Sequence, residues 1–380
     1  MFEFTEEQLM IRDSAREFAQ TRLAPSVVER DRNQEFRREL FDEMGKLGFT
    51  GIIFPEEYGG TGGSYLAYIL ACEEIARVDA GMAAAFSAST SLGVSTLFDH
   101  GTPEQKEKFG IPLAKGEKLA AFALTESGAG TDSGAQKSVA VLDGDHYVLN
   151  GSKTFITNAD DAEIYIVLAL TDPEAGARGI TAFILEKGTE GFTFGKKENK
   201  MGVRTSKTMD LEFKDVRIPV ENRLGDEGKG FRIAMMGLDG GRIGIGAQCC
   251  GIAQAALDEA AKYSKERKQF GKPISINQGI SFKIAEVATE LEAARLLTYK
   301  AAALKEAGKP YSIAAAMTKL FSSDMVVKAA SECLQIFGGI GYSEELPMAR
   351  FYRDAKITQI YEGTSEVQRM VVGGGILAGY

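Results

Sequence analysis

The sequence predicts a multidomain α+β fold: an N-terminal α-helical domain, a middle antiparallel β domain of barrel-like form, and a C-terminal four-helix bundle. Apolar residues recur at helical spacing in the first and last parts of the chain, whereas short apolar runs separated by turn residues fill the middle. The 380 residues, 44% of them hydrophobic, are enough for two or three structural units. We expect these units to span residues 1–118, 119–226 and 227–380.

The N-terminal part is expected to be helical from its first residues. Thr5-x-x-Gln8 fits a capping box, which opens the first helix. Residues 36–47 carry apolar side chains at helical spacing, and the alanine-rich stretch 65–98 suits two buried helices. Residues 102–105 combine an N-cap threonine, a proline at the first helical position and a capping-box glutamine, so another helix is expected there.

The middle part is expected to form strands. Asp143-Gly144-Asp145 separates two short apolar runs, which predicts a hairpin around an Asp-Gly turn. Seven or eight short runs of this kind favour a small antiparallel sheet or a barrel-like domain. The predicted strands cover about residues 118–124, 138–142, 146–149, 163–170, 180–185, 192–196, 208–213 and 216–219.

From about residue 228 the chain is expected to be helical again. Glycines are dense up to residue 264, and their missing side chains would let helices or a cofactor approach the backbone closely. Tight helix packing is the favoured explanation for most of them. Further helices are expected from about residues 276, 311 and 344. The last one is expected near Ser365, because Ser365-x-x-Gln368 fits a capping box.

Composition argues against several classes of function. The net charge is −9 and no basic run occurs, so neither nucleic acid nor a membrane surface is expected as a partner. His100 and His146 are the only histidines, which excludes a histidine-rich metal site, and no metal is expected. The four cysteines form no C-x-x-C pair, so a reduced, cytosolic protein is expected. No apolar run reaches membrane-spanning length, and no signal peptide is expected.

One carboxylate near the C-terminus, Glu362, is the candidate general base. Gly363 gives the turn conformational freedom, and the following helix would place Glu362 just outside its N-terminus. The helix dipole there favours the ionised carboxylate, whereas burial in an apolar pocket favours the protonated form. A carboxylate between those two influences suits a general base near neutral pH. A solvated glutamate that helps to start the last helix would explain the same motif equally well.

Four motifs in a fixed order give Glu362 its context. They are Leu124-Thr-Glu-Ser-Gly-Ala-Gly-Thr-Asp132, Arg267-x-x-Phe270-Gly271, Gln335-Ile-Phe-Gly-Gly339 and Tyr361-Glu362-Gly363-Thr364. Together they resemble the acyl-CoA dehydrogenase family, and the chain looks most similar to its short-chain, butyryl-CoA dehydrogenase-like branch. The resemblance implies the same three-part fold. It also implies FAD-dependent dehydrogenation of a short- to medium-chain acyl-CoA to the trans-2-enoyl-CoA, with Glu362 as the base and hydride transfer to flavin N5.

The resemblance also implies how FAD is held. No G-x-G-x-x-G follows a strand, so a Rossmann site is excluded. The flavin ring would instead lie along residues 122–131 and 155–157, and the pyrophosphate and adenosine would meet residues of a second subunit. An arginine suits a diphosphate, and paired glycines let backbone N–H groups approach an anion. The implied cofactor-binding residues are Phe122, Leu124, Thr125, Gly130, Thr131, Phe155, Ile156, Thr157, Arg267, Gln269, Phe270, Gln278, Gln335, Ile336, Gly338, Gly339, Thr364 and Glu366.

On the substrate side, the resemblance implies contacts with the acyl-CoA from Thr131, Asp239, Arg242 and Gly363. Some relatives carry their base just before this arginine, but here that position is Gly241, which cannot act as one. This strengthens the assignment of Glu362. Two departures from the family are Ser127, where proline is usual, and Phe155, where several members have tryptophan. The second leaves the tuning of the flavin potential open.

The resemblance further implies a homotetramer that passes electrons to electron-transferring flavoprotein. Acyl-CoA oxidases use oxygen instead, but they usually carry an extra C-terminal region. Two alternatives stay open from the sequence: a branched-chain acyl-CoA dehydrogenase, and a non-catalytic CoA- or flavin-binding protein of the same fold.

Overall fold

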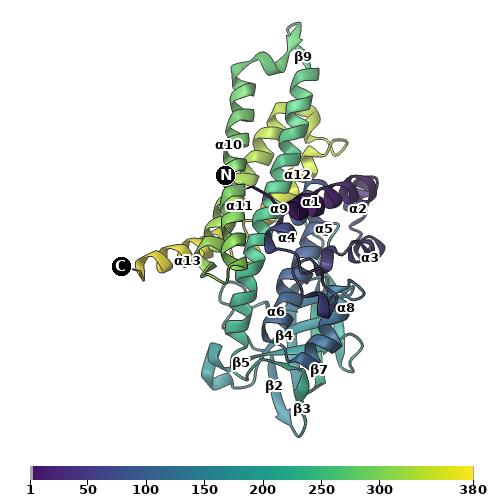
Figure 1. Cartoon of the computed structure of the whole chain (residues 1–380), viewed down its shortest axis with the longest axis vertical. Coiled ribbons are helices and arrows are strands. Elements are labelled where there is room, and N and C mark those ends of the chain that lie inside the picture. Colours follow the sequence, from purple (N-terminus) through teal and green to yellow (C-terminus); the bar gives the residue numbers. More distant parts are fainter. Residues whose placement is uncertain (1–2, 380) are drawn as a thin grey trace.

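The computed structural model describes residues 3–379, which are arranged along one long axis (Figure 1). The β-sheet lies at the lower end of this view, the N-terminal helices lie beside and above it, and long C-terminal helices extend to the opposite end. Helices, strands and helices follow one another in chain order. This confirms the predicted α+β class.

The N-terminal part is helical, as predicted. Both expected capping boxes are confirmed, because the Gln8 and Gln105 backbone N–H groups donate to the hydroxyls of Thr5 and Thr102 at 3.2 and 3.3 Å. A short helix, α2, was not predicted. The helices are α1 Glu6–Phe18, α2 Val27–Asn33, α3 Arg38–Lys46, α4 Tyr65–Val78, α5 Ala80–Ser87, α6 Ser95–His100, α7 Pro103–Gln105 and α8 Ile111–Ala114, with π-helical turns at Ala19–Leu23, Ala88–Val94 and Lys106–Gly110.

The middle part forms one sheet in the order β6-β7-β3-β2-β4-β5-β8, with β1 also paired to β4. The predicted hairpin is confirmed, because Asp143 pairs with His146 across a two-residue turn in which Gly144 has a φ of +63°. The strands are β1 Ala120–Ala123, β2 Val139–Asp143, β3 His146–Thr157, β4 Ile164–Leu170, β5 Ile180–Glu186, β6 Phe192–Lys197, β7 Thr208–Pro219 and β8 Arg223–Leu224.

The sheet differs from the prediction in four details. Strand β3 extends to Thr157, beyond the predicted residues 146–149, and β8 was not predicted. The sheet also differs in its pairing and in one strand boundary. It is not purely antiparallel, since β1 runs parallel to β4 over its whole length and β2 meets β4 in parallel at one position. A long loop rather than a hairpin follows β1, so β1 is free to join a strand of the same direction. In addition, β7 is continuous, so the strand predicted at residues 216–219 belongs to it.

The C-terminal part consists of three long helices with two shorter ones packed against α11. A small hairpin between the first two was not predicted. None of the helices in residues 3–379 combines the length and the apolar character needed to cross a membrane. The elements are α9 Gly230–Glu266, β9 Lys268–Gln269, β10 Lys272–Pro273, α10 Gln278–Glu306, α11 Ser312–Phe337, α12 Met348–Ile357 and α13 Ser365–Leu377.

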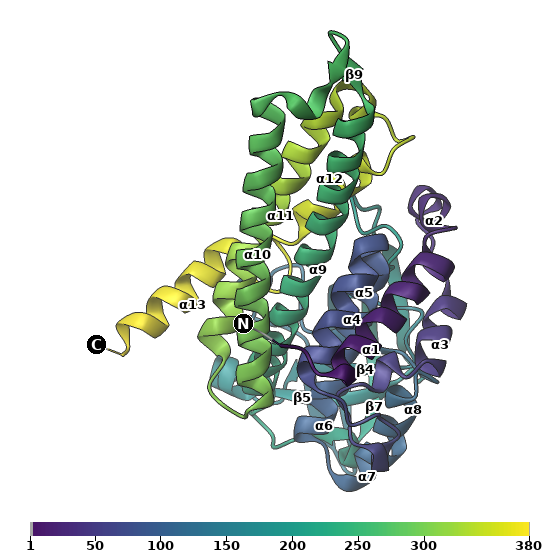
Figure 2. The same cartoon turned by 45° about the horizontal axis from the view of Figure 1, so that its top comes forward.

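The last helix begins where predicted, but a different residue caps it. The Thr364 hydroxyl accepts from the Val367 N–H, so the N-cap is Thr364 and the predicted Ser365–Gln368 capping box is wrong. The Ser365 hydroxyl instead donates to Asp324 of α11 at 3.3 Å. The Ser365 side chain, which the local pattern assigned to the cap, is therefore bonded to a residue distant in the sequence. Both views show α13 projecting sideways from the rest of the chain (Figures 1 and 2).

The glycines of α9 make close helix packing possible. A Cβ atom at Gly244 would collide with the Ser87 hydroxyl, and one at Gly246 would collide with Thr318 of α11. Helix α4 packs between α1 and α9 and is therefore buried along almost its whole length. The expectation that helix packing explains most of these glycines is confirmed. Helix α9 thus joins the N-terminal helices to the C-terminal ones.

Candidate active site

Glu362 lies in the turn between α12 and α13, in a strained backbone conformation. Its φ is +53°, and that of Gly363 is +91°. A left-handed conformation is unfavourable for a glutamate and is kept only where the surroundings enforce it. Two consecutive left-handed residues redirect the chain, and the Glu362 side chain comes to rest against α9.

The contact between Glu362 and α9 depends on a glycine. A Cβ atom at Gly241 would collide with Glu362 Oε2, and it would also lie 2.9 Å from the side chain of Leu92. Leu92 belongs to the π-helical turn between α5 and α6, a type of irregularity that is frequent at functional sites. Only a residue without a side chain leaves room for the carboxylate here.

Glu362 is half-buried, and nearby positive charges balance its carboxylate only in part. Its Oε2 atom is buried and has no hydrogen-bond partner among the described residues. Burial raises the pKa of Glu362 from its ordinary value to about 7, against the opposing charges of Arg242 and Lys319. A carboxyl group with this pKa can accept a proton near neutral pH and release it again.

The turn itself is bonded to three helices. Arg242 of α9 donates to the Glu362 carbonyl at 3.4 Å and holds Asp239 at 2.6 Å. Lys319 of α11 donates to the Gly363 carbonyl at 2.7 Å, and Gln368 of α13 donates to both carbonyls. The predicted residues Glu362, Gly363, Asp239 and Arg242 are therefore brought together.

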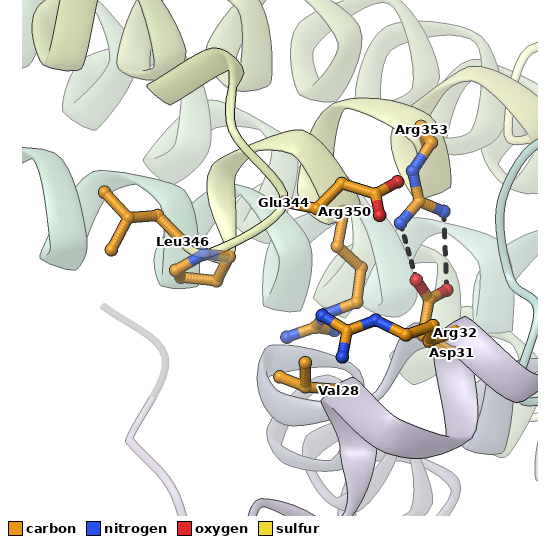
Figure 3. A pocket seen from close by; sticks show the side chains of 8 residues that line it. Val28, Asp31, Arg32, Glu344, Leu346, Arg350 and Arg353 are labelled. Carbon is orange, nitrogen blue, oxygen red and sulfur yellow. Dashed lines mark hydrogen bonds and ion pairs between the residues drawn. The ribbon is translucent and has the colours of Figure 1, made fainter. Parts of the chain in front are cut away.

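Helix α12, which leads into this turn, is anchored by buried charges. Arg353 forms an ion pair with Asp31 of α2 at 2.5 Å, and Asp354 accepts from the Val203 N–H at 2.6 Å. Figure 3 shows the Arg353–Asp31 pair beside a small pocket between α2 and the start of α12. The pocket, of about 20 Å³, has room for little more than a water molecule, and the ion pair beside it ties α12 to α2.

A second group of predicted residues meets at the end of β1 and the bulge of β3. The Thr154 N–H donates to the Thr125 carbonyl at 2.8 Å, which places residues 122–125 beside residues 155–157. The loop after β1 is fixed to β3 by a buried ion pair, in which Lys153 Nζ donates to Glu126 at 2.8 Å. Glu126 also accepts from the backbone N–H groups of Lys137 and Ser138 at 2.7 and 3.0 Å.

The surface formed there fits a flat ligand such as a flavin. Phe155 has a φ of +58° and is 63% exposed, although it lies within a strand. A Cβ atom at Gly128 or Gly130 would meet no atom within 4 Å, so the loop offers bare backbone on an open side. An aromatic side chain held exposed in a strained conformation is a candidate contact for a planar ligand.

Apart from Thr364 and Glu366, which lie beside Glu362 at the start of α13, the remaining cofactor candidates lie around the β9–β10 hairpin and the end of α11. Phe270 and Gly271 form the turn between β9 and β10, both with positive φ, and the Phe270 side chain is fully exposed. Tyr263 and Phe337 stack with ring centroids 4.2 Å apart, which places this hairpin next to Gly338 and Gly339. The hairpin is at the top of Figure 1 and the sheet at the bottom, so one chain does not bring the two groups together.

Comparisons with known proteins identify the family to which the chain belongs. The N-terminal, middle and C-terminal domains of acyl-CoA dehydrogenases match residues 5–117, 121–216 and 228–377. A short-chain specific acyl-CoA dehydrogenase of Megasphaera elsdenii is 56% identical over 99% of both chains. The chain belongs to the acyl-CoA dehydrogenase family.

Solved structures of acyl-CoA dehydrogenase-like chains agree closely with this fold. Butyryl-CoA dehydrogenase from Megasphaera elsdenii superimposes with a TM-score of 0.98 at 55% identity, over 99% of this chain and 100% of the other. A chain from a structural study of the electron transferring flavoprotein of Acidaminococcus fermentans gives a TM-score of 0.98 at 54% identity, over 99% of both chains. The predicted family is confirmed.

Sequence reasoning missed two residues of this acyl-CoA dehydrogenase site, Lys319 and Gln368. Lys319 is one of four charged residues of α11, and it is completely buried. It comes two positions after the apolar run of residues 313–317, and this is the signal that could have found it, since a charge on an apolar helix face requires a partner. Gln368 was predicted only as part of the cap. Of the residues predicted beside Glu362, Thr364 caps α13 and Glu366 is exposed.

Proposed function

We propose that this chain is an FAD-dependent acyl-CoA dehydrogenase that converts a short acyl-CoA to its trans-2-enoyl-CoA. The observation that supports this most directly is Glu362: a half-buried residue whose Oε2 atom is buried without a hydrogen-bond partner among the described residues, with a pKa of about 7, set against the glycine face of α9. Such a group suits the removal of a weakly acidic proton next to a thioester.

In the proposed reaction Glu362 takes the α-proton of the acyl-CoA as the α,β double bond forms. The enolate that develops on the thioester oxygen needs hydrogen-bond donors. The Glu362 N–H is available for this role, because no acceptor among residues 3–379 is bonded to it. Bound substrate would exclude water from the base, which would raise its proton affinity and protect the enolate.

FAD, when bound, supplies the acceptor for the β-hydrogen, which leaves as hydride. Phe122, Leu124, Thr125 and the loop to Thr131 would hold the ring on one side, and Phe155, Ile156 and Thr157 on the other. The exposed ring of Phe155 and the open backbone at Gly130 support this assignment. The adenosine and pyrophosphate would be held from a second subunit by residues at the hairpin and after α11, namely Arg267, Gln269, Phe270, Gln278, Gln335, Ile336, Gly338 and Gly339.

The walls near the base favour a short acyl chain. Leu92 lies against the position of Gly241, and Tyr68 lies 3.4 Å from a Cβ atom placed at Gly244. The Tyr68 hydroxyl donates to Ser87 at 3.1 Å, which closes this side of α9 with a buried polar cluster. The short-chain specificity of the Megasphaera relative agrees with this reading. Thr131, Asp239, Arg242 and Gly363 would contact the CoA thioester side.

We further propose electron-transferring flavoprotein as the electron acceptor and a homotetramer as the assembly. A closely similar chain comes from a study of an electron transferring flavoprotein, which supports the first. Large apolar side chains that are exposed on the C-terminal helices support the second, because a single chain leaves them uncovered. They include Phe282, Leu296, Met370 and Leu377.

An anaerobic titration with butyryl-CoA tests the proposed function. The flavin absorbance of the purified protein is expected to bleach, and longer or branched acyl-CoAs are expected to bleach it more slowly. Glu362→Gln is expected to retain FAD and ligand binding but to lose at least about 10³-fold in bleaching rate, since its side chain cannot accept the proton. Glu292→Gln, an exposed substitution on α10, serves as the control. Near-normal bleaching by Glu362→Gln would exclude Glu362 as the base.

A further inference from the structure

Three side chains from three helices hold the turn that carries Glu362. Lys319 Nζ donates to the Gly363 carbonyl at 2.7 Å, and Gln368 Nε2 donates to the Glu362 and Gly363 carbonyls at 3.2 and 3.0 Å. Arg242 Nε donates to the Glu362 carbonyl at 3.4 Å. The backbone carbonyl groups of Glu362 and Gly363 are therefore both held by side chains of other helices.

Holding these carbonyls fixes where the base points. Each peptide unit is planar, so a donor on its carbonyl oxygen fixes the rotation of the whole plane. Glu362 and Gly363 both have positive φ, and such a turn persists only if its surroundings determine it. With the two planes fixed, the Glu362 side chain stays directed at Gly241 of α9.

Hydrogen bonding alone does not explain why the donor from α11 is a lysine. Gln368 already donates to the same Gly363 oxygen, and a neutral amide avoids the cost of burying a charge. Lys319 is completely buried, and this burial lowers the pKa of its amine to about 8. A positive charge kept at such a cost needs a reason at this place, and Glu362 is a facing acid whose Oε2 atom has no hydrogen-bond partner among the described residues.

The charges around the two groups are few. Lys319 faces Glu362, Asp324 of its own helix, and Cys249 and Arg242 of α9. Glu362 faces Arg242 and Lys319, and on α4 it faces only Tyr65, Tyr68 and Cys72, whose raised pKa values keep them neutral. Arg242 is already paired with Asp239 at 2.6 Å. Arg242 and Lys319 therefore both oppose the protonation of Glu362, and the effect of Arg242 is the larger. Lys319 is the one of the two that forms no ion pair of its own among residues 3–379.

We propose that Lys319 is a positioning residue of the dehydrogenation: it fixes the Glu362 turn through the Gly363 carbonyl and places a positive charge beside the base. The inference rests on the function proposed above. The hydrogen bond keeps the carboxylate at the reacting carbon, and the charge keeps it ionised until the α-proton is transferred.

Substitutions separate the two roles. Lys319→Met removes bond and charge, and it is expected to lower kcat by about 10- to 100-fold with the KM for butyryl-CoA changed less than threefold. The apparent pKa on the acidic side of its kcat–pH profile is expected to rise by about one pH unit, because a charge that favours the ionised carboxylate has been lost. Lys319→Arg keeps the charge and is expected to leave this apparent pKa unchanged. Lys319→Gln is measured in the same way and replaces Lys319→Met if that variant does not fold.

A second measurement does not depend on turnover. The infrared carbonyl absorption of protonated Glu362, assigned by its absence in Glu362→Gln, is followed with pH in the full-length holoenzyme and should titrate higher in Lys319→Met. Lys200→Met is the matched control, because Lys200 is another largely buried lysine and donates to the Ser206 carbonyl at 2.6 Å. In Lys200→Met, Glu362 is expected to titrate at the same pH as in the unmodified protein.

The outcomes are distinct. An unshifted Glu362 titration in Lys319→Met, or an equal shift in Lys200→Met, overturns the role of Lys319. If the unmodified protein is not bleached by butyryl-CoA, the proposed function fails, and the infrared titration still decides whether Lys319 controls the ionisation of Glu362.

Discussion

At the scale of single residues, Glu362 makes the stability of the protein depend on pH in a defined direction. Its pKa is about 7 in the folded chain, against an ordinary value of 4.5, because burial disfavours the ionised carboxylate. The folded chain therefore binds this proton more tightly than the unfolded chain. The contribution of this carboxyl group to stability is present below about pH 4.5 and is lost as the pH rises to about 7.

Glu362→Gln is uncharged at every pH and escapes this loss. We expect its Tm to exceed that of the unmodified protein by a few degrees more at pH 8 than at pH 5. Thermal melts of both proteins at the two pH values measure the effect, with Glu292→Gln as the control for removing an exposed carboxylate. The same Tm difference at both pH values would contradict the raised pKa.

Local signals at Glu362 were visible in the sequence, but its long-range partners were not. Gly363 after an isolated glutamate, followed by a hydroxyl residue, marks a turn before a helix, and the structure has that turn. Lys319 lies 44 positions away from Gly363, and no local pattern connects the two. The cap was misplaced by one residue for the same reason, because Asp324 of α11 bonds to Ser365.

At the scale of elements, the glycines of α9 are not interchangeable with other helical glycines. Gly241→Ala is expected to displace Glu362, because the new methyl group would occupy the place of Oε2. FAD retention should persist while the bleaching rate falls by about 100-fold, and overpacking should cost about 1–3 kcal/mol. Gly279→Ala on α10 meets no atom within 4 Å and should leave the Tm unchanged or slightly higher. Equal effects of the two substitutions on Tm would contradict this account.

The elements themselves were largely predictable because their signals are local. The caps at Thr5 and Thr102 and the Asp-Gly hairpin each depend on residues within four positions of one another. The parallel pairing of β1 with β4 depends on residues more than 40 positions apart, such as Ala120 and Ile164, and the sequence gives no signal for it. The hairpin of β9 and β10 was missed because its strands are two residues long and Phe270 is an unusual turn residue.

At the scale of the whole molecule, the two groups of cofactor candidates lie at opposite ends of one chain. The residues of β1 and β3 belong to the sheet, and the hairpin turn is at the far end of α9 (Figure 1). The sequence order of the motifs indicates that they belong to one site, but it says nothing about which chain supplies each part. If FAD needs both groups, only a second copy of the chain can complete the site.

Phe270 tests this directly. It is fully exposed in the single chain and sits in a left-handed turn position that favours asparagine over phenylalanine. Phe270→Asn should therefore not destabilise the isolated fold, yet it should weaken FAD retention if the hairpin of one copy covers the cofactor of another. The flavin content after gel filtration and the molar mass in solution, compared with 41.0 kDa for one chain, measure both effects. Full FAD retention by Phe270→Asn would exclude a contact between this side chain and the cofactor, and a mass of one chain would exclude the shared site.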